Sequence, residues 1–166
     1  GVDGRGAERI RHVLDHVRDL AGIDHAVRVE SENSFPSNVG FGSSSSGFAA
    51  LAMAAQEAAG LGLDRPTVST IARRGSSSAA RAVTGAYSDL SAGLNDQDCR
   101  SHRCETGVGE DGFDPENDLR IVTALVPAYK ETEEAHKEAE QSHMFDARLS
   151  HVHDQLAEMR DALREG

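Results

Sequence analysis

A serine- and glycine-rich segment from Pro36 to Gly47 is the feature that most constrains the fold of this chain. Before it, Ala26 to Glu32 alternates apolar and polar residues, as a half-buried strand does. After it, Phe48 to Ala55 is a run of small apolar residues, typical of a helix that is buried on most sides. The pattern therefore predicts a strand, a loop and a buried helix in succession.

Such a loop would place backbone amides and serine hydroxyls at the N-terminus of a helix. Amides without intrahelical partners and the positive end of the helix dipole attract anions, and glycines let a phosphate approach the backbone. No lysine follows Gly47, so the common nucleotide loop that ends in Gly-Lys-Ser/Thr is absent. Serine and glycine are also typical of flexible linkers, but Phe35 and Phe41 are poor linker residues. We therefore expect a phosphate-binding loop.

A second serine cluster, from Gly75 to Arg81, follows two consecutive arginines. It begins another predicted helix, so hydroxyls, amides and guanidinium groups come together, and this combination suits phosphate or carboxylate recognition. Arg81 would project from the first turns of that helix toward whatever Ser76 and Ser78 hold, with a surface ion pair as the alternative. The two arginines before Gly75 are expected at a helix C-terminus, in solvent.

Periodicity predicts the remaining elements. Apolar residues recur three or four apart from Ala7 to Leu20, as in an amphipathic helix, and Asp64 is expected to cap another helix that ends near Gly75. The apolar stripe of the last helix is expected to cover the sheet of its own domain, with a partner helix as the alternative. The other predictions are a strand over Val83 to Leu90, a long surface loop over Asn95 to Asp118, a buried strand over Leu119 to Val126, and a helix over Phe145 to Leu163.

The charge of the chain restricts its partners. The formal net charge is -11, and Lys130 and Lys137 are the only lysines among 17 basic residues. Contact with nucleic acid or an anionic membrane surface is therefore not expected. An acidic composition with so little lysine predicts a protein that works in concentrated salt, where screening weakens self-repulsion; an ordinary acidic cytosolic protein is the alternative.

The cysteines and the hydropathy predict the compartment. No apolar stretch approaches the length of a spanning helix, so we expect a soluble, intracellular protein. Cys99 and Cys104 are too few and too close together for a secreted disulfide framework, which favours the reducing cytoplasm. With His102 they offer three soft ligands, but structural zinc sites generally need four, so no metal site is predicted.

Both serine clusters resemble motifs of the diphosphomevalonate decarboxylases, a family of the GHMP kinase superfamily. The family's phosphate loop reads approximately S-E-N-N-F-P-T-A-A-G-L-A-S-S-A-A-G-F, and Ser31 to Phe48 reads S-E-N-S-F-P-S-N-V-G-F-G-S-S-S-S-G-F. The second signature, A-R-x-G-S-G-S-A-C-R, is matched by Ala72 to Arg81, which reads A-R-R-G-S-S-S-A-A-R. Two motifs in the expected order make the resemblance specific.

The resemblance implies an α+β fold, the GHMP-kinase-type sandwich of a mixed sheet with helices, incomplete relative to the family. Residues 1–127 would be the central part of the N-terminal domain, with the phosphate loop, and residues 128–166 the helical start of the C-terminal domain. The implied activity is ATP-dependent decarboxylation of 5-diphosphomevalonate or 5-phosphomevalonate, with ATP and Mg²⁺ as cofactors and a homodimer left open. Another small-molecule GHMP kinase and a noncatalytic phosphate-binding fragment are the alternatives.

The resemblance also implies roles for individual residues. Ser76 and Ser78 match serines that contact the phosphate end of the mevalonate substrate, and Arg81 matches a catalytic arginine that binds near its carboxylate. The residues that match the ATP-phosphate loop are Gly40, Gly42, Ser43, Ser44, Ser45, Ser46 and Gly47.

Departures from the family pattern limit these assignments. Asn38 and Gly42 stand where the family has alanines, Ala80 replaces a cysteine and Ser77 replaces a glycine, so the number of phosphates on the substrate stays open. The family's substrate-contacting tyrosine and lysine and its catalytic aspartate find no counterpart here, and the aspartates of this chain are not assigned that role. We therefore expect an incomplete active site.

Overall fold

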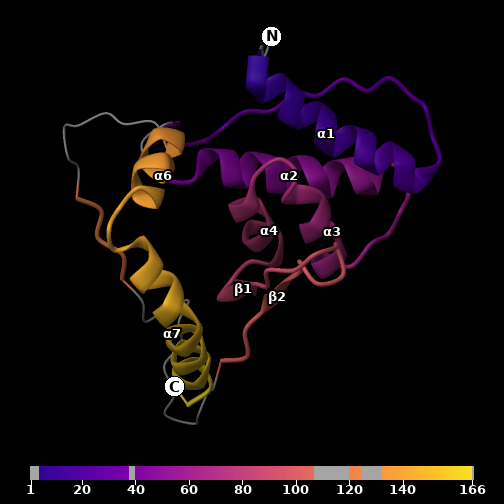
Figure 1. The fold of residues 1–166 in the computed structure, drawn as a ribbon. Helices are drawn as coiled ribbons and strands as arrows, with labels where there is room; N and C mark the ends of the chain where they lie inside the picture. The colour runs from indigo at the N-terminus through magenta and orange to yellow at the C-terminus, as the bar shows by residue number, and fades with distance from the viewer. Residues whose placement is uncertain (1–3, 38–39, 107–119, 125–131, 166) are drawn as a thin grey trace. The chain divides into compact units, whose positions relative to one another are not determined.

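The computed structural model describes most of the chain, namely residues 4–37, 40–106, 120–124 and 132–165. The chain divides into two compact units, Gly1–Arg103 and Cys104–Gly166, which are described in turn (Figure 1). The domain boundary expected at residue 127 lies outside the described residues and stays a prediction. Among the described residues, no helix is both long enough and apolar enough to cross a membrane.

The first unit begins with two helices on either side of the serine-rich loop. Helix α1 (Gly4–Ala21) buries Val13 and Val17, which confirms the amphipathic helix predicted from its spacing. Helix α2 (Ser43–Ala58) begins within the serine run and buries small apolar residues. This confirms the predicted passage from loop to buried helix.

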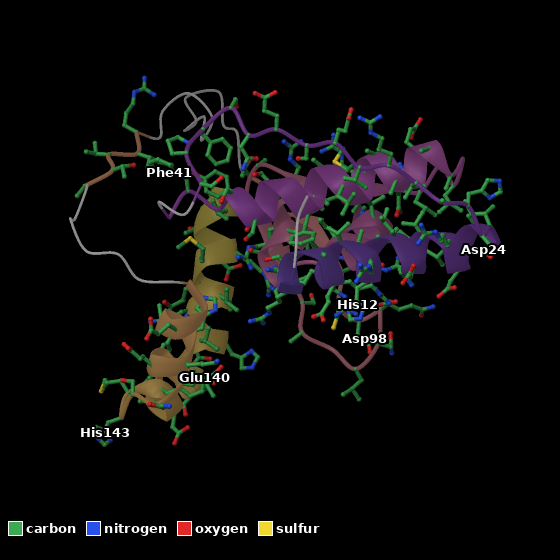
Figure 2. All side chains as sticks on the ribbon, turned by 90° about the horizontal axis from the view of Figure 1, so that it is seen from above. His12, Asp24, Phe41, Asp98, Glu140 and His143 are labelled. Atoms are coloured by element: carbon green, nitrogen blue, oxygen red, sulfur yellow. The ribbon has the colours of Figure 1, made fainter. Side chains whose placement is uncertain are left out.

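The strand predicted over Ala26 to Glu32 is wrong. No strand of the described residues lies beside this segment, and Val27 and Val29 are 51% and 41% exposed. Without a neighbouring strand to accept and donate hydrogen bonds, the alternating pattern gives an extended connection instead. The connection runs from the end of α1, near Asp24, back to the start of α2, near Phe41 (Figures 1 and 2).

Two short helices follow α2 and place the second serine cluster. Helix α3 (Arg65–Ala72) is capped by Asp64, whose Oδ1 accepts a hydrogen bond from the Thr67 amide at 2.9 Å, as predicted. The chain then turns, and helix α4 (Ser77–Thr84) begins inside the second cluster. Helices α2, α3 and α4 pack against one another (Figure 1).

A two-stranded antiparallel sheet completes the first unit. Strand β1 (Ser88–Leu90) pairs with β2 (Ser101–Arg103), with Asp89 opposite His102. The strand predicted over Val83 to Leu90 is thus confirmed only in its last residues, because α4 continues through Thr84. Strand β2 also interrupts the predicted long loop, of which residues 107–118 lie outside the described part.

The core of the first unit is apolar between the helices and contains hydrogen-bonded serine and threonine hydroxyls between the helices and the two strands. The Ser101 amide donates to Ser69 Oγ at 2.9 Å, and Ser101 Oγ donates to the Asp89 carbonyl and lies 2.8 Å from Thr84 Oγ1. These hydrogen bonds tie both strands to α3 and α4. The buried apolar residues that pack together in this core are Val13, Val17, Phe48, Ala49, Ala52, Val68, Ile71, Ala72, Ala79 and Val83.

The second unit contains helices α6 (Thr132–Glu140) and α7 (Phe145–Glu165). Helix α7 confirms the predicted last helix, but none of its described residues is buried, and Leu149 and Met159 are 51% and 58% exposed. The prediction that its apolar stripe covers a sheet is therefore wrong for these residues. The described part of the second unit contains no strand that could supply such a sheet.

The buried strand predicted over Leu119 to Val126 is not formed in its described residues. Residues 120–124 are extended and exposed, with Ile121 and Val122 at 83% and 92% exposure. A short apolar run forms a buried strand only when neighbouring strands lie on both sides, and no described residue provides one here. The remaining residues of this prediction lie outside the described part.

Candidate functional site

The two serine clusters, 33 residues apart in sequence, meet directly. The hydroxyls of Ser45, on α2, and Ser78, on α4, share a hydrogen bond. The Ser78 hydroxyl also lies 3.1 Å from that of Ser76. Three of the predicted site serines therefore form one half-buried hydroxyl chain, and the starts of α2 and α4 lie side by side.

Neither helix start has a side-chain cap in the described part of the chain. The N-cap of α2 is Gly42, which adopts the left-handed conformation (φ 71°, ψ 32°) that glycine accepts without strain. The N-cap of α4 is Ser76, whose hydroxyl bonds Ser78 instead of a backbone amide. The Ser46 and Ala79 amides donate to the carbonyls of the N-cap residues, Gly42 and Ser76. No side chain caps the amides before them in either first turn, and this donor set fits a phosphate.

Phe48, directly after the first cluster, lies close to Gly75, at the start of the second. A Cβ atom built on Gly75 would lie 2.1 Å from Cδ1 of Phe48, so only glycine fits at this position. Arg9, on α1, donates a hydrogen bond from Nε to the Gly75 carbonyl, and its Cζ lies 4.6 Å from the centre of the Phe48 ring. We refer to Arg9, Phe48 and Gly75 as the junction.

The two arginines before Gly75 are held by one aspartate. Asp96 forms ion pairs with Arg73 and Arg74, and Arg74 Nη2 lies 2.8 Å from Asp96 Oδ2. Arg74 Nη1 also donates to the Thr70 carbonyl at 2.6 Å. The prediction that these arginines lie at a helix C-terminus is confirmed, but their side chains are only 30% and 29% exposed, so their placement in solvent is wrong.

The arginines change the titration of their partner. Hydrogen bonds from Arg74, and then from Arg73, stabilise the ionised form and lower the pKa of Asp96 to about 2, against the opposing effect of partial burial. Asp96 therefore has a structural task in this chain, as the anchor of the residues that lead into the second cluster.

The remaining predicted site residues take different positions. Arg81 lies in the last turn of α4, is exposed, and forms no ion pair with any described residue. Ser44 is exposed, and Ser46 Oγ donates to the Ser43 carbonyl at 3.1 Å within the first turn of α2. The structure joins serines of the two clusters by hydrogen bonds, but among the described residues the Arg81 side chain forms no hydrogen bond or ion pair with them.

Other ligand sets do not assemble. Among the residues described, no group of three His, Cys, Asp or Glu side chains could hold a metal ion. Cys99 is buried and its thiol donates to the Gly93 carbonyl at 3.1 Å.

The sequence did not point to the junction residue Arg9 or to Asp96. Arg9 lies 66 residues before the carbonyl that it binds, and Asp96 lies in a polar loop without periodicity. The one local signal was the pair of adjacent arginines after α3, which needs a carboxylate when it is partly buried.

Comparison with known proteins decides the family. The sequence model of the diphosphomevalonate decarboxylase-like N-terminal domain matches residues 1–101. The chain belongs to this family. The match spans both serine clusters and all of the helices that position them, so the family resemblance read from the motifs is confirmed.

Individual relatives support the same assignment. The chain is 68% identical over 165 residues to a phosphomevalonate decarboxylase of Haloferax volcanii, covering 99% of this chain and 49% of that protein. It is 31% identical over 137 residues to a diphosphomevalonate decarboxylase of Bos taurus, covering 74% of this chain and 32% of that protein. The chain therefore spans about half or less of the length of these relatives.

A solved structure confirms the fold class. The mevalonate diphosphate decarboxylase of Staphylococcus aureus superposes with a TM-score of 0.78 at 28% identity, over 99% of this chain and 49% of that chain. That of Enterococcus faecalis gives a TM-score of 0.71 at 25% identity, over 96% and 47%. The α+β fold of the family is thus present as a partial domain, of which the described residues contain one antiparallel pair of strands.

Proposed function

We propose that the protein to which this chain belongs is an ATP-dependent decarboxylase of phosphorylated mevalonate. The observation that carries the proposal is the contact between the two serine clusters at two uncapped helix starts. A reaction that transfers phosphate between two phosphorylated molecules needs two anion-binding elements side by side. Membership of the family and the relatives named as decarboxylases support decarboxylation as the reaction.

We favour 5-phosphomevalonate over 5-diphosphomevalonate as the substrate. The Haloferax volcanii relative, which matches this chain at 68% identity, is a phosphomevalonate decarboxylase. The relatives named for the diphosphate match at much lower identity, such as 31% for the Bos taurus protein. A second rival, a plain kinase of the same superfamily, lacks the motif that ends at Arg81.

Each cluster has a separate task in this proposal. The start of α2, from Gly40 to Gly47, binds the phosphates of ATP, and Mg²⁺ arrives with them. Ser76 and Ser78 hold the phosphate of the mevalonate substrate, and Arg81, exposed one turn beyond Ser78, pairs with its carboxylate.

The proposed reaction has two steps. The 3-hydroxyl oxygen attacks the γ-phosphorus of ATP, the bond to the bridging oxygen breaks, and ADP and a proton leave. The bond between C3 and the ester oxygen then breaks, and the phosphate takes its electron pair, while the bond between the carboxylate carbon and C2 breaks and supplies the pair that forms the double bond between C2 and C3. Carbon dioxide and inorganic phosphate are released. Amide and hydroxyl donors stabilise the charge on both departing phosphates.

Three further features belong to the proposal. The free thiols of Cys99 and Cys104 suit a reducing cytoplasm. A second domain beginning near residue 128 would supply the rest of the active site. The exposed apolar stripe of α7, which lies within that domain, would be covered by the rest of the domain or by the second copy of a homodimer.

A coupled assay on the full-length protein tests the function. With ATP and 5-phosphomevalonate, we expect one carbon dioxide for each ADP, whereas ADP alone would identify a kinase. Carbon dioxide from 5-diphosphomevalonate alone would identify the diphosphate as the substrate, and neither product with either substrate would identify a noncatalytic phosphate-binding protein. Arg81→Ala is expected to lower kcat/KM about 100-fold, since it removes one charge-stabilising donor. The control is Arg28→Ala, an exposed arginine outside both clusters, which should retain full turnover. Equal rates for the two variants would refute the role of Arg81.

A further inference from the structure

We propose that Arg9 is a positioning residue that sets the distance between the ATP-binding and substrate-binding serines by holding Gly75 against Phe48. The inference rests on the proposed function and adds a residue that lies outside both motifs. Its basis is the junction, in which Arg9 donates to the Gly75 carbonyl and stacks on the Phe48 ring.

The junction touches each cluster at its nearest residue. Phe48 follows Gly47, the last residue of the first cluster, and Gly75 precedes Ser76, the N-cap of α4. A movement of the Gly75 carbonyl therefore moves the start of α4 directly. Because Ser78 is the second residue of α4, a shift of the helix start also shifts the Ser78 hydroxyl.

Gly75 is tightly packed on the side that faces Phe48. The Phe48 ring fills the space where a Gly75 side chain would stand, so the two backbones cannot approach further. Among the described residues, the Arg9 bond is the one hydrogen bond that the Gly75 carbonyl accepts, and the Gly75 and Ser76 amides donate to the Ala72 carbonyl at 3.0 and 3.2 Å. Loss of Arg9 would therefore let Gly75 move outward, which lengthens or breaks the bond between Ser45 and Ser78.

Substitutions of Arg9 can separate the effect of its charge from the effect of its hydrogen bond and its stacking on Phe48. Lysine retains a positive charge but has neither a planar group to stack on Phe48 nor an Nε donor in the same place. Methionine retains most of the apolar stem and loses both the charge and the bond. Arg11, an exposed arginine on the same helix, provides a matched control.

The test uses the full-length protein with Arg9→Met, Arg9→Lys and Arg11→Met. We measure kcat, KM for 5-phosphomevalonate and KM for ATP, and the dissociation constant of 5-phosphomevalonate by calorimetry. Arg9→Met and Arg9→Lys are both expected to raise KM and the dissociation constant for 5-phosphomevalonate about tenfold, since misplacement of about 1 Å is enough for such losses. Arg11→Met should leave both values within about twofold.

Specific results would overturn the inference. Full rescue by Arg9→Lys would mean that charge matters and position does not. A lower kcat with unchanged KM and dissociation constant in both Arg9 variants would mean that Arg9 only keeps the protein folded, and thermal unfolding of each variant reports that loss directly. Failure of the proposed function is seen separately, as no carbon dioxide from the wild type, and the calorimetric comparison still decides the role of Arg9.

Discussion

The absence of a side chain at Gly75 lets the backbone there lie against the Phe48 ring, next to the contact between the two serine clusters. A methyl group on Gly75 would overlap the Phe48 ring, so Gly75→Ala is expected to destabilise the protein by about 1–3 kcal/mol. Gly47→Ala is the control, because apart from its chain neighbours and the backbone of its own helix no described atom lies within 4 Å of the added Cβ, and alanine favours a helix by about 1 kcal/mol. Urea unfolding of both variants checks the contrast; equal stabilities would contradict the close contact.

The ion pairs of Asp96 predict a dependence of stability on acid. Its folded pKa of about 2 lies below the ordinary value of 3.8, so the stabilisation is present above pH 4 and is lost as the pH falls toward 2. Since the side chain is 37% exposed, we discount the contribution to about 1 kcal/mol. Asp96→Asn should lower the free energy of unfolding by that amount at pH 7. Between pH 4 and 2 the free energy of unfolding of this variant, measured by urea denaturation, should change less than that of the wild type. A profile identical to that of the wild type would refute the pairing.

Residue types within the motifs were predictable, and their partners were not. The serines were recognisable from the local composition and from their position before a predicted helix. The resemblance to the family motifs then predicted which phosphate each cluster binds. Asp96 and Arg9 could not be found this way, because a hydrogen bond between residues far apart in sequence leaves no local pattern.

The cap of α3 gives a prediction at the scale of one element. Asp64→Ala removes the carboxylate that accepts from the Thr67 amide and is expected to lower the free energy of unfolding by about 1 kcal/mol. Hydrogen bonds from the Thr67 side chain, and then from its amide, lower the pKa of Asp64, so the loss should shrink in acid as the wild-type carboxylate is protonated. Asp24→Ala, an exposed aspartate in the connection after α1, is the control. Similar stability of the two variants would show that the cap is not effective.

Helices were predicted well and strands poorly, for a physical reason. The spacing of Val13 and Val17 or of Leu149 and Leu156 is a property of one helix, because its hydrogen bonds close within the segment. The alternation of Val27 and Val29 requires a second strand from elsewhere, which the sequence of the segment cannot specify. The apolar stripe of α7 likewise indicated a face to be covered but not what covers it.

The charge of the whole molecule predicts its response to salt. A net charge of -11 repels itself at low ionic strength, and salt shortens the range of that repulsion. Raising KCl from about 0.1 M to about 2 M is therefore expected to raise the midpoint of thermal unfolding by several degrees. Sucrose at matched osmolality is the control, because it stabilises proteins by exclusion from their surface but does not screen charge. A midpoint that falls with KCl, or rises equally in sucrose, would contradict a salt-adapted surface.

The hydroxyl network beneath the helices has a consequence for how the first unit opens. Strands of three residues normally fray, and their amide protons exchange with solvent within seconds to minutes. The Ser101 amide, however, is buried and donates to a hydroxyl of α3, while its side chain is held by β1 and α4. Deuterium should therefore reach this amide only when helices and strands separate together, so a three-residue strand would record the cooperative opening of the entire unit.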